Sequence, residues 1–313
     1  MIRDKITIVG AGNVGATAAY AAANRGLGDI VLLDVVKGLA EGKALDIAEA
    51  SPIQLYDCAI VGTTDWQETA DSDLVIITSG LPRKPGMSRD DLLAKNVRII
   101  KEVAEKTVKY SPDSVIIVVS NPLDAMVYAV YKVTGFAESR VVGMAGALDS
   151  ARFSYFIARE IGVSVENVKC VLLGGHGDDM VPLPRFTSVS GIPVTELVGE
   201  EKVAELIERT RKGGGEIVNL LGYSAYYAPA AGAVEMAEAI LKDKKTVLSC
   251  CAYCDREYRV GGYFVGVPVV LAKNGVQRII ELDLNESEWA EFNGSLAHVK
   301  EMVQRVDELL QWN

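Results

Sequence analysis

Short apolar runs alternate with longer amphipathic stretches through residues 1–145. The β-rich runs cover 5–9, 29–33, 59–61, 74–78, 115–119 and 141–144. Helical stretches lie between them, and the longest, 91–110, repeats its apolar positions at helical spacing. Alternation of this kind predicts an α/β fold with a parallel, doubly wound sheet. Ligands of such sheets bind beyond the carboxyl ends of the strands.

Residues 146–313 follow a different pattern, in which helices and antiparallel strands are mixed. Helices are predicted at 147–161, 201–221, 228–241 and 286–310, a strand pair at 264–270 and 277–282, and one buried strand at 168–173. The helix at 201–221 contains an unusual Gly213-Gly214-Gly215. We therefore expect a doubly wound domain, 1–145, followed by a mixed α+β domain, 146–313, that carries the substrate and the catalytic residues.

The first predicted strand leads directly into Gly10-Ala11-Gly12-Asn13-Val14-Gly15, and an alanine-rich helix follows. A G-x-G-x-x-G pattern alone is weak evidence, but a strand before it and a helix after it are the required context. Gly10 allows the tight turn, Gly12 lets a pyrophosphate approach, and Gly15 lets helix and strand pack closely. The segment predicts a dinucleotide-binding (Rossmann) turn, with Asn13 and Val14 among the cofactor contacts. The alternative is a glycine-rich turn without a ligand.

Asp34 ends the second predicted strand. An acid at this place accepts hydrogen bonds from the ribose hydroxyls of NAD and repels the 2′-phosphate of NADP. The next residues are Val35 and Val36, and neither is an arginine. The sequence therefore predicts NAD as the cofactor.

Composition limits the partners. The net charge of −10 disfavours nucleic acid and anionic membranes. No apolar run approaches the roughly 18 residues of a membrane span, and the N-terminus has no signal-peptide pattern. Five cysteines, an odd number, argue against a disulfide framework and for a reducing cytoplasm. Cys251 and Cys254 could suggest zinc, but residues three apart in a strand face opposite sides, so we predict no metal.

Histidine is rare in this chain, and one of the two stands at a strand end. His176 follows the predicted strand 168–173 through two glycines. Histidine is the side chain best suited to exchange protons near neutral pH. Asp149 and Arg152 share one helix face, so the carboxylate could orient the imidazole and the forked guanidinium could hold a substrate carboxylate. The alternatives are a loop histidine and an ordinary intrahelical ion pair.

The segment 80–91 lies between a strand and the long helix. It contains two prolines, two glycines and three cations, Arg83, Lys84 and Arg89. Stiff pieces joined at glycines are typical of a lid over an active site. A solvated surface loop is the alternative.

Five blocks together resemble the lactate/malate dehydrogenase family, in particular its lactate-dehydrogenase-like malate dehydrogenases. The blocks are 10–15, 80–89, 120–124, 148–152 and 174–178, and the resemblance covers essentially the whole chain. It implies a reversible NAD-dependent oxidation of (S)-malate to oxaloacetate. Two alternatives stay open, a dehydrogenase of lactate or another 2-hydroxy acid, and an NAD-binding protein without catalysis.

The resemblance also implies roles for single residues. His176 is implied as the proton donor and acceptor, with Asp149 fixing its ring. Arg152 is implied to bind the C1 carboxylate, Asn121 to bond the reacting oxygen near the nicotinamide, and Arg89 to polarise the carbonyl. Further implied cofactor contacts are Asn96, Val119 and Asn121.

Position 83 separates substrates within the family, in which glutamine accompanies pyruvate and arginine accompanies oxaloacetate. Arg83 therefore implies a dicarboxylate substrate, whose second carboxylate needs a local cation in an acidic protein. The resemblance further implies a homo-oligomer, either a tetramer or a dimer.

Overall fold

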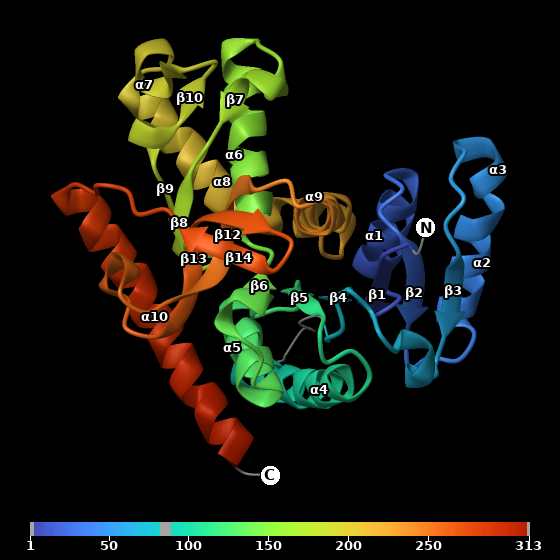
Figure 1. Cartoon of the computed structure of the whole chain (residues 1–313). Helices are drawn as coiled ribbons and strands as arrows, with labels where there is room; N and C mark the ends of the chain where they lie inside the picture. The colour runs from blue at the N-terminus through green and yellow to red at the C-terminus, as the bar shows by residue number, and fades with distance from the viewer. Residues whose placement is uncertain (1–2, 82–88, 312–313) are drawn as a thin grey trace.

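The computed structural model describes residues 3–81 and 89–311, and Figure 1 shows their arrangement. Among these residues, the first half contributes six strands, β1 (Lys5–Val9), β2 (Asp29–Leu33), β3 (Ile60–Thr63), β4 (Leu74–Ile77), β5 (Val115–Val118) and β6 (Val141–Gly143). They pair in parallel in the order β3-β2-β1-β4-β5-β6. This is the doubly wound order, with β1 at the point from which the chain winds in both directions.

Helices cover both faces of this sheet. Those of the first half are α1 (Asn13–Asn24), α2 (Leu39–Glu49), α3 (Ser51–Gln54), α4 (Arg89–Tyr110) and α5 (Leu123–Thr134). Alternate strand residues point to opposite faces, so Ile76 belongs to the core under α1, whereas Val75 and Ile77 belong to the core under α4 and α5. Two helices from the second half complete the layers, α9 (Tyr227–Leu241) beside α1 and α10 (Glu286–Gln311) beside α5 (Figure 1).

The second half extends the same sheet with antiparallel strands. These are β8 (Leu172–Gly174), β9 (Met180–Pro182), β12 (Thr246–Cys254), β13 (Tyr263–Ala272) and β14 (Gly275–Ile279). A separate small sheet contains β7 (Val168–Lys169), β10 (Ser188–Val189) and β11 (Ile192–Pro193). The remaining helices are α6 (Gly146–Ile161), α7 (Val194–Leu197) and α8 (Glu200–Leu221). Short 3-10 turns are η1 (Trp66–Thr69), η2 (Glu138–Arg140), η3 (Val165–Asn167), η4 (Gly177–Asp179), η5 (Pro184–Phe186) and η6 (Glu257–Arg259).

One pairing joins the two halves. Strand β6 lies antiparallel to β12, with Gly143 opposite Cys251. A side chain at Gly143 has no room, because a Cβ there lies 2.6 Å from a methyl of Val127 and 2.8 Å from the Cβ of Cys251. Within the described residues the main sheet therefore runs without a break from β3 through β6 and β12 to β9.

The predicted fold class is confirmed, and most predicted elements match to within a few residues. One prediction is wrong: 168–173 is not a single strand. The run is interrupted at Cys170 and Val171, so that β7 joins the small sheet and β8 joins the main one. Val168 of β7 and Leu172 of β8 are buried in one core and Leu173 is buried in another, whereas Lys169 between them is exposed. Among the helices that the structure describes, none has the length and apolar character needed to cross a bilayer.

Candidate active site

The β1–α1 turn has the geometry that its three glycines suggest. Gly10 has φ 105°, a conformation that favours glycine. A Cβ on Gly15 would lie 1.8 Å from the Gly10 carbonyl oxygen, whereas a Cβ on Gly12 would meet open space. The α1 N-terminus has no side-chain cap and no acid in its first turn. Its N–H groups can therefore serve a phosphate, with Asn13 and Val14 in the first turn.

Asp34 is held in place at the end of β2 by two backbone donors. The Ala11 N–H donates to Oδ2 at 2.7 Å and the Val36 N–H donates to Oδ1 at 2.9 Å. The carboxylate borders a cavity of about 500 Å³ that also reaches Gly10 and Gly12. An acid, a cavity and an uncapped helix end together fit a dinucleotide without a 2′-phosphate.

Asn96 and Val119 are both buried. The Asn96 side chain connects two backbone segments, accepting from the Leu81 N–H at 2.8 Å and donating to the Asn121 carbonyl oxygen at 2.7 Å. It therefore fixes the start of the 80–91 segment relative to Asn121. Direct contact of Asn96 or Val119 with the cofactor stays a prediction.

His176 and Asp149 meet, although 27 positions separate them in sequence. The imidazole Nδ1 lies 2.9 Å from Asp149 Oδ2, and Asp149 is 2% exposed. Because an ionised carboxylate only accepts hydrogen bonds, it keeps a proton on Nδ1 and leaves Nε2 to exchange protons. The predicted orienting contact is thus present, made between α6 and the segment that follows β8.

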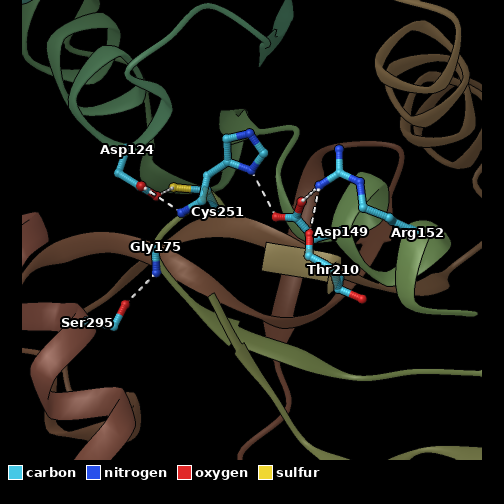
Figure 2. Close-up of polar contacts among 8 residues, drawn as sticks. Asp124, Asp149, Arg152, Gly175, Thr210, Cys251 and Ser295 are labelled. Carbon is cyan, nitrogen blue, oxygen red and sulfur yellow. Dashed lines mark hydrogen bonds and ion pairs between the residues drawn. The ribbon is translucent and has the colours of Figure 1, made fainter. Parts of the chain in front are cut away.

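Arg152 is anchored beside the same carboxylate. Its Nη1 lies 3.4 Å from Asp149 Oδ1 and donates to the Thr210 carbonyl oxygen at 3.3 Å. Figure 2 shows the Arg152 side chain reaching toward Asp149 and Thr210. The arginine side chain is 12% exposed, so its charge is largely shielded from water. A cation held in this way can form a bidentate pair with a carboxylate.

Burial and three neighbouring charges together determine the pKa of His176. Burial lowers the pKa of the imidazolium, but the charge and hydrogen bond of Asp149 raise it, and Asp124 raises it further, against a smaller opposing effect of Arg152. The carboxylates prevail, so the pKa of His176 lies above its ordinary value of 6.5.

Asp124 is a site residue that the sequence reasoning missed. Its Oδ2 accepts from the backbone N–H of His176 at 3.1 Å, and its Oδ1 accepts from the Cys251 thiol at 3.2 Å (Figure 2). Ser295 of α10 similarly accepts from the Gly175 N–H at 2.7 Å. Burial is the main reason that the pKa of Asp124 is raised, and the donors at His176 and Cys251 oppose this rise. The only sequence signal was the place of Asp124 in the 120–124 block.

A second cavity, of about 690 Å³, opens beside the histidine. Asn121 and His176 border it, and acidic residues together with Arg305 of α10 also line it. Arg83 lies outside the described residues. Arg89 begins α4, but its side chain is also outside the description.

The cysteines pack as ordinary core residues. Cys250, Cys251 and Cys254 are fully buried in β12, and Cys251 faces the opposite core from Cys254, as predicted. Within residues 3–81 and 89–311, no group of three or more potential ligands lies close enough to hold a metal.

Comparison with known proteins agrees with this geometry. Residues 4–143 match the lactate/malate dehydrogenase NAD-binding domain model, and 146–310 match the α/β C-terminal domain model. A malate dehydrogenase of Rhodopirellula baltica is 59% identical over 313 residues, or 99% of each chain. The apo malate dehydrogenase structure from Picrophilus torridus is 48% identical, with a TM-score of 0.97 over 99% of each chain. The Cryptosporidium parvum lactate dehydrogenase structure with lactic acid and NAD is 41% identical, with a TM-score of 0.95 over 98% of this chain and 99% of that one. The chain belongs to the lactate/malate dehydrogenase family.

Proposed function

We propose that this chain catalyses the reversible NAD-dependent oxidation of (S)-malate to oxaloacetate. The observation that carries the proposal is the contact of His176 with the buried Asp149, with Arg152 beside the same carboxylate. A proton-exchanging group and a carboxylate-binding cation then face one small substrate. Relatives with the highest identities reported above are malate dehydrogenases, which supports the dicarboxylate.

The matched family model is that of an NAD-binding domain, and the chain binds NAD. We assign the pyrophosphate to the turn from Gly10 to Gly15 and the ribose hydroxyls to Asp34. The open space at Gly12 and the two backbone bonds to Asp34 support this assignment. When bound, NAD accepts or supplies the hydride at the substrate C2 carbon.

Two arginines divide the substrate between them in this proposal. Arg152 binds the C1 carboxylate, and Arg83 binds the second carboxylate that distinguishes oxaloacetate from pyruvate. With pyruvate, Arg83 stays unpaired in a closed site. An unpaired buried charge costs about 2–5 kcal/mol. That is roughly 30- to 4,000-fold in rate at about 1.4 kcal/mol per tenfold.

His176 transfers the proton. In the direction of reduction the imidazolium donates from Nε2 to the oxygen on C2, and in oxidation the neutral ring removes the proton of the hydroxyl. Asp149 stabilises the imidazolium throughout, since it is buried and 2.9 Å away. Asn121 lines the same cavity as His176 and bonds the reacting oxygen, and Arg89 polarises the carbonyl.

The test is NADH oxidation by the purified chain, with oxaloacetate and with pyruvate at equal concentration. We expect a preference for oxaloacetate of at least about 30-fold, the lower end of the range derived above. Equal or faster turnover of pyruvate contradicts the proposed substrate and leaves lactate or another 2-hydroxy acid in its place. No turnover with either keto acid, in a chain that still binds NADH, favours the non-catalytic alternative.

We also propose that the chain forms a homo-oligomer, a dimer or a tetramer, in the cytoplasm. Support comes from large apolar side chains left exposed at the end of α3 and around the α8–α9 connection, among them Leu55 at 87%, Leu220 at 79% and Tyr227 at 70%. Exposed apolar surface marks association sites. Light scattering that gives only the monomer mass contradicts the oligomer.

Finally, we propose that the chain consists of two functional domains with a boundary after residue 145. Residues 1–145 bind the cofactor, and residues 146–313 supply the catalytic and carboxylate-binding groups His176, Asp149 and Arg152. Asn121 and Arg83 reach the substrate from the first of the two parts.

A further inference from the structure

Helix α8 has three consecutive glycines in its interior, Gly213, Gly214 and Gly215. Each glycine costs a helix interior about 1 kcal/mol relative to alanine. A helix of this length does not need such residues for its own sake. At least one of them therefore requires an explanation in what the helix contacts.

The three glycines differ in their surroundings. A Cβ on Gly213 would lie 2.4 Å from Arg152 Cδ and 2.7 Å from Arg152 Nε. A Cβ on Gly214 or Gly215 would meet nothing within 4 Å. Gly213 is buried and Gly215 is exposed. Only Gly213 leaves space that another side chain of the described structure fills.

The aliphatic part of Arg152 crosses α8 at this point. One turn earlier on the same helix face, the Thr210 carbonyl oxygen accepts from Arg152 Nη1 at 3.3 Å. The other anchor of the guanidinium is Asp149, at 3.4 Å. Gly213 thus permits the close approach, while Thr210 and Asp149 fix where the charge ends.

A methyl group at Gly213 must displace something. The atoms in its way belong to the outer part of a long side chain and not to backbone, so Arg152 can move while α8 stays in place. Movement of Arg152 stretches or breaks its bonds to Thr210 and Asp149. The effect then falls on the position of the guanidinium more than on the stability of the fold.

We propose that Gly213 is a positioning residue that sets the place of the Arg152 guanidinium and thereby the binding of the substrate carboxylate. This inference rests on the proposed function, specifically on the role of Arg152. A displacement of about 1 Å in a positioning group can cost on the order of 100-fold in rate. This role explains why a glycine stands at 213 despite its cost to the helix.

The experiment compares Gly213→Ala with Gly215→Ala, a matched change two residues away in the same helix. We expect Gly215→Ala to keep the KM for oxaloacetate within about twofold and to keep or raise the Tm. Gly213→Ala should raise that KM by about 10- to 100-fold while NADH affinity stays unchanged, since neither Gly213 nor Arg152 belongs to the cofactor turn. A KM for Gly213→Ala equal to that of Gly215→Ala overturns the inference.

A second measurement does not depend on activity. Arg152→Ala removes the atoms that the methyl would meet. If the methyl collides only with Arg152, Gly213→Ala lowers the Tm of the unmodified chain but does not lower the Tm of the Arg152→Ala variant. A double variant whose Tm lies below that of Arg152→Ala by the same amount overturns the proposal. Lack of oxaloacetate turnover in the unmodified chain contradicts the proposed function instead, and the Tm comparison still tests the contact.

Discussion

At the scale of single residues, His176 lies between two buried carboxylates that do different work. Asp149 contacts the ring at Nδ1, and Asp124 contacts the backbone N–H of the same residue. One carboxylate therefore fixes the orientation of the imidazole and the other fixes the chain that carries it. Both also raise the pKa of the imidazolium.

The raised pKa of His176 predicts opposite pH dependences for the two directions. Reduction needs the imidazolium, so kcat/KM for oxaloacetate should fall as pH rises through a pKa above 6.5. Oxidation needs the neutral ring, so kcat/KM for malate should rise through the same pKa. Asp149→Asn should move both profiles toward lower pH, because it removes the largest contribution that raises the pKa of His176. Initial rates across pH with saturating cofactor provide the measurement.

The control for this prediction is His176→Asn. Loss of a general acid should lower the rate by about 10²- to 10⁴-fold and remove the pH dependence, while NADH still binds. A variant that keeps more than about a tenth of the original rate shows that another group supplies the proton.

Replacement of Asp124 should shift the pH profile in the same direction as replacement of Asp149, but by less. Asp124→Asn keeps an acceptor for the His176 N–H but removes the charge, so the pH profile of reduction should move toward lower pH by less than in Asp149→Asn. Cys251→Ala is the matched control, because it removes a donor to the same carboxylate without removing its charge. A profile that moves in Cys251→Ala but not in Asp124→Asn speaks against an electrostatic role for Asp124.

Residue types and spacing predicted part of this site. Asp149 and Arg152 were placed on one helix face from their spacing alone, and His176 from its position after an apolar run. Their mutual contact depends on how α6 packs against β8, which spacing does not encode. Asp124 acts on a backbone N–H, and Gly213 acts by lacking a side chain, so neither offers a side-chain pattern to recognise.

At the scale of elements, the glycines of the β1–α1 turn have two different functions: Gly15 allows close packing, and Gly12 leaves space for the cofactor. Gly15→Ala should destabilise the chain by about 1–3 kcal/mol, because its Cβ meets the Gly10 carbonyl oxygen at 1.8 Å and neither backbone can retreat easily. Gly12→Ala meets no protein atom within 4 Å, so stability should hold while NADH affinity falls. Urea denaturation and NADH fluorescence titration distinguish the two variants. Equal NADH affinity in Gly12→Ala and the unmodified chain removes Gly12 from the phosphate site.

Helices and strands were predictable where both faces of a strand are buried, or where buried positions repeat at the period of the element. The runs 5–9 and 29–33 are strands at those bounds, and 286–310 is a helix whose apolar positions face the core. The short strands β9, β10 and β11 escaped prediction because two or three residues have no period of their own. Their partners decide their conformation, and the same is true of the division of 168–173 between two sheets.

At the scale of the whole molecule, the two halves share one sheet and contribute side chains to the same buried cores. Strand β6 of the first half pairs with β12 of the second, and α1 packs against α9. One cluster of buried side chains contains Ile6 and Ile30 together with Val265 and Phe292. Separation of the halves at residue 145 therefore exposes apolar surface on both.

This shared core predicts that the chain unfolds as a single unit, even though two family models match it. Trp66 reports on the first half, and Trp289, packed against Tyr258 and Phe292, reports on the second. One variant keeps Trp66 as its only tryptophan, and a second carries Trp66→Phe and keeps the other tryptophans. The urea midpoints from the fluorescence of the two variants should coincide with each other and with the midpoint from far-UV circular dichroism. Two midpoints, with NADH binding lost at only one of them, show instead that residues 1–145 fold independently. In that case the β6–β12 pairing contributes little to cooperativity, and the first half alone should remain folded and bind NADH.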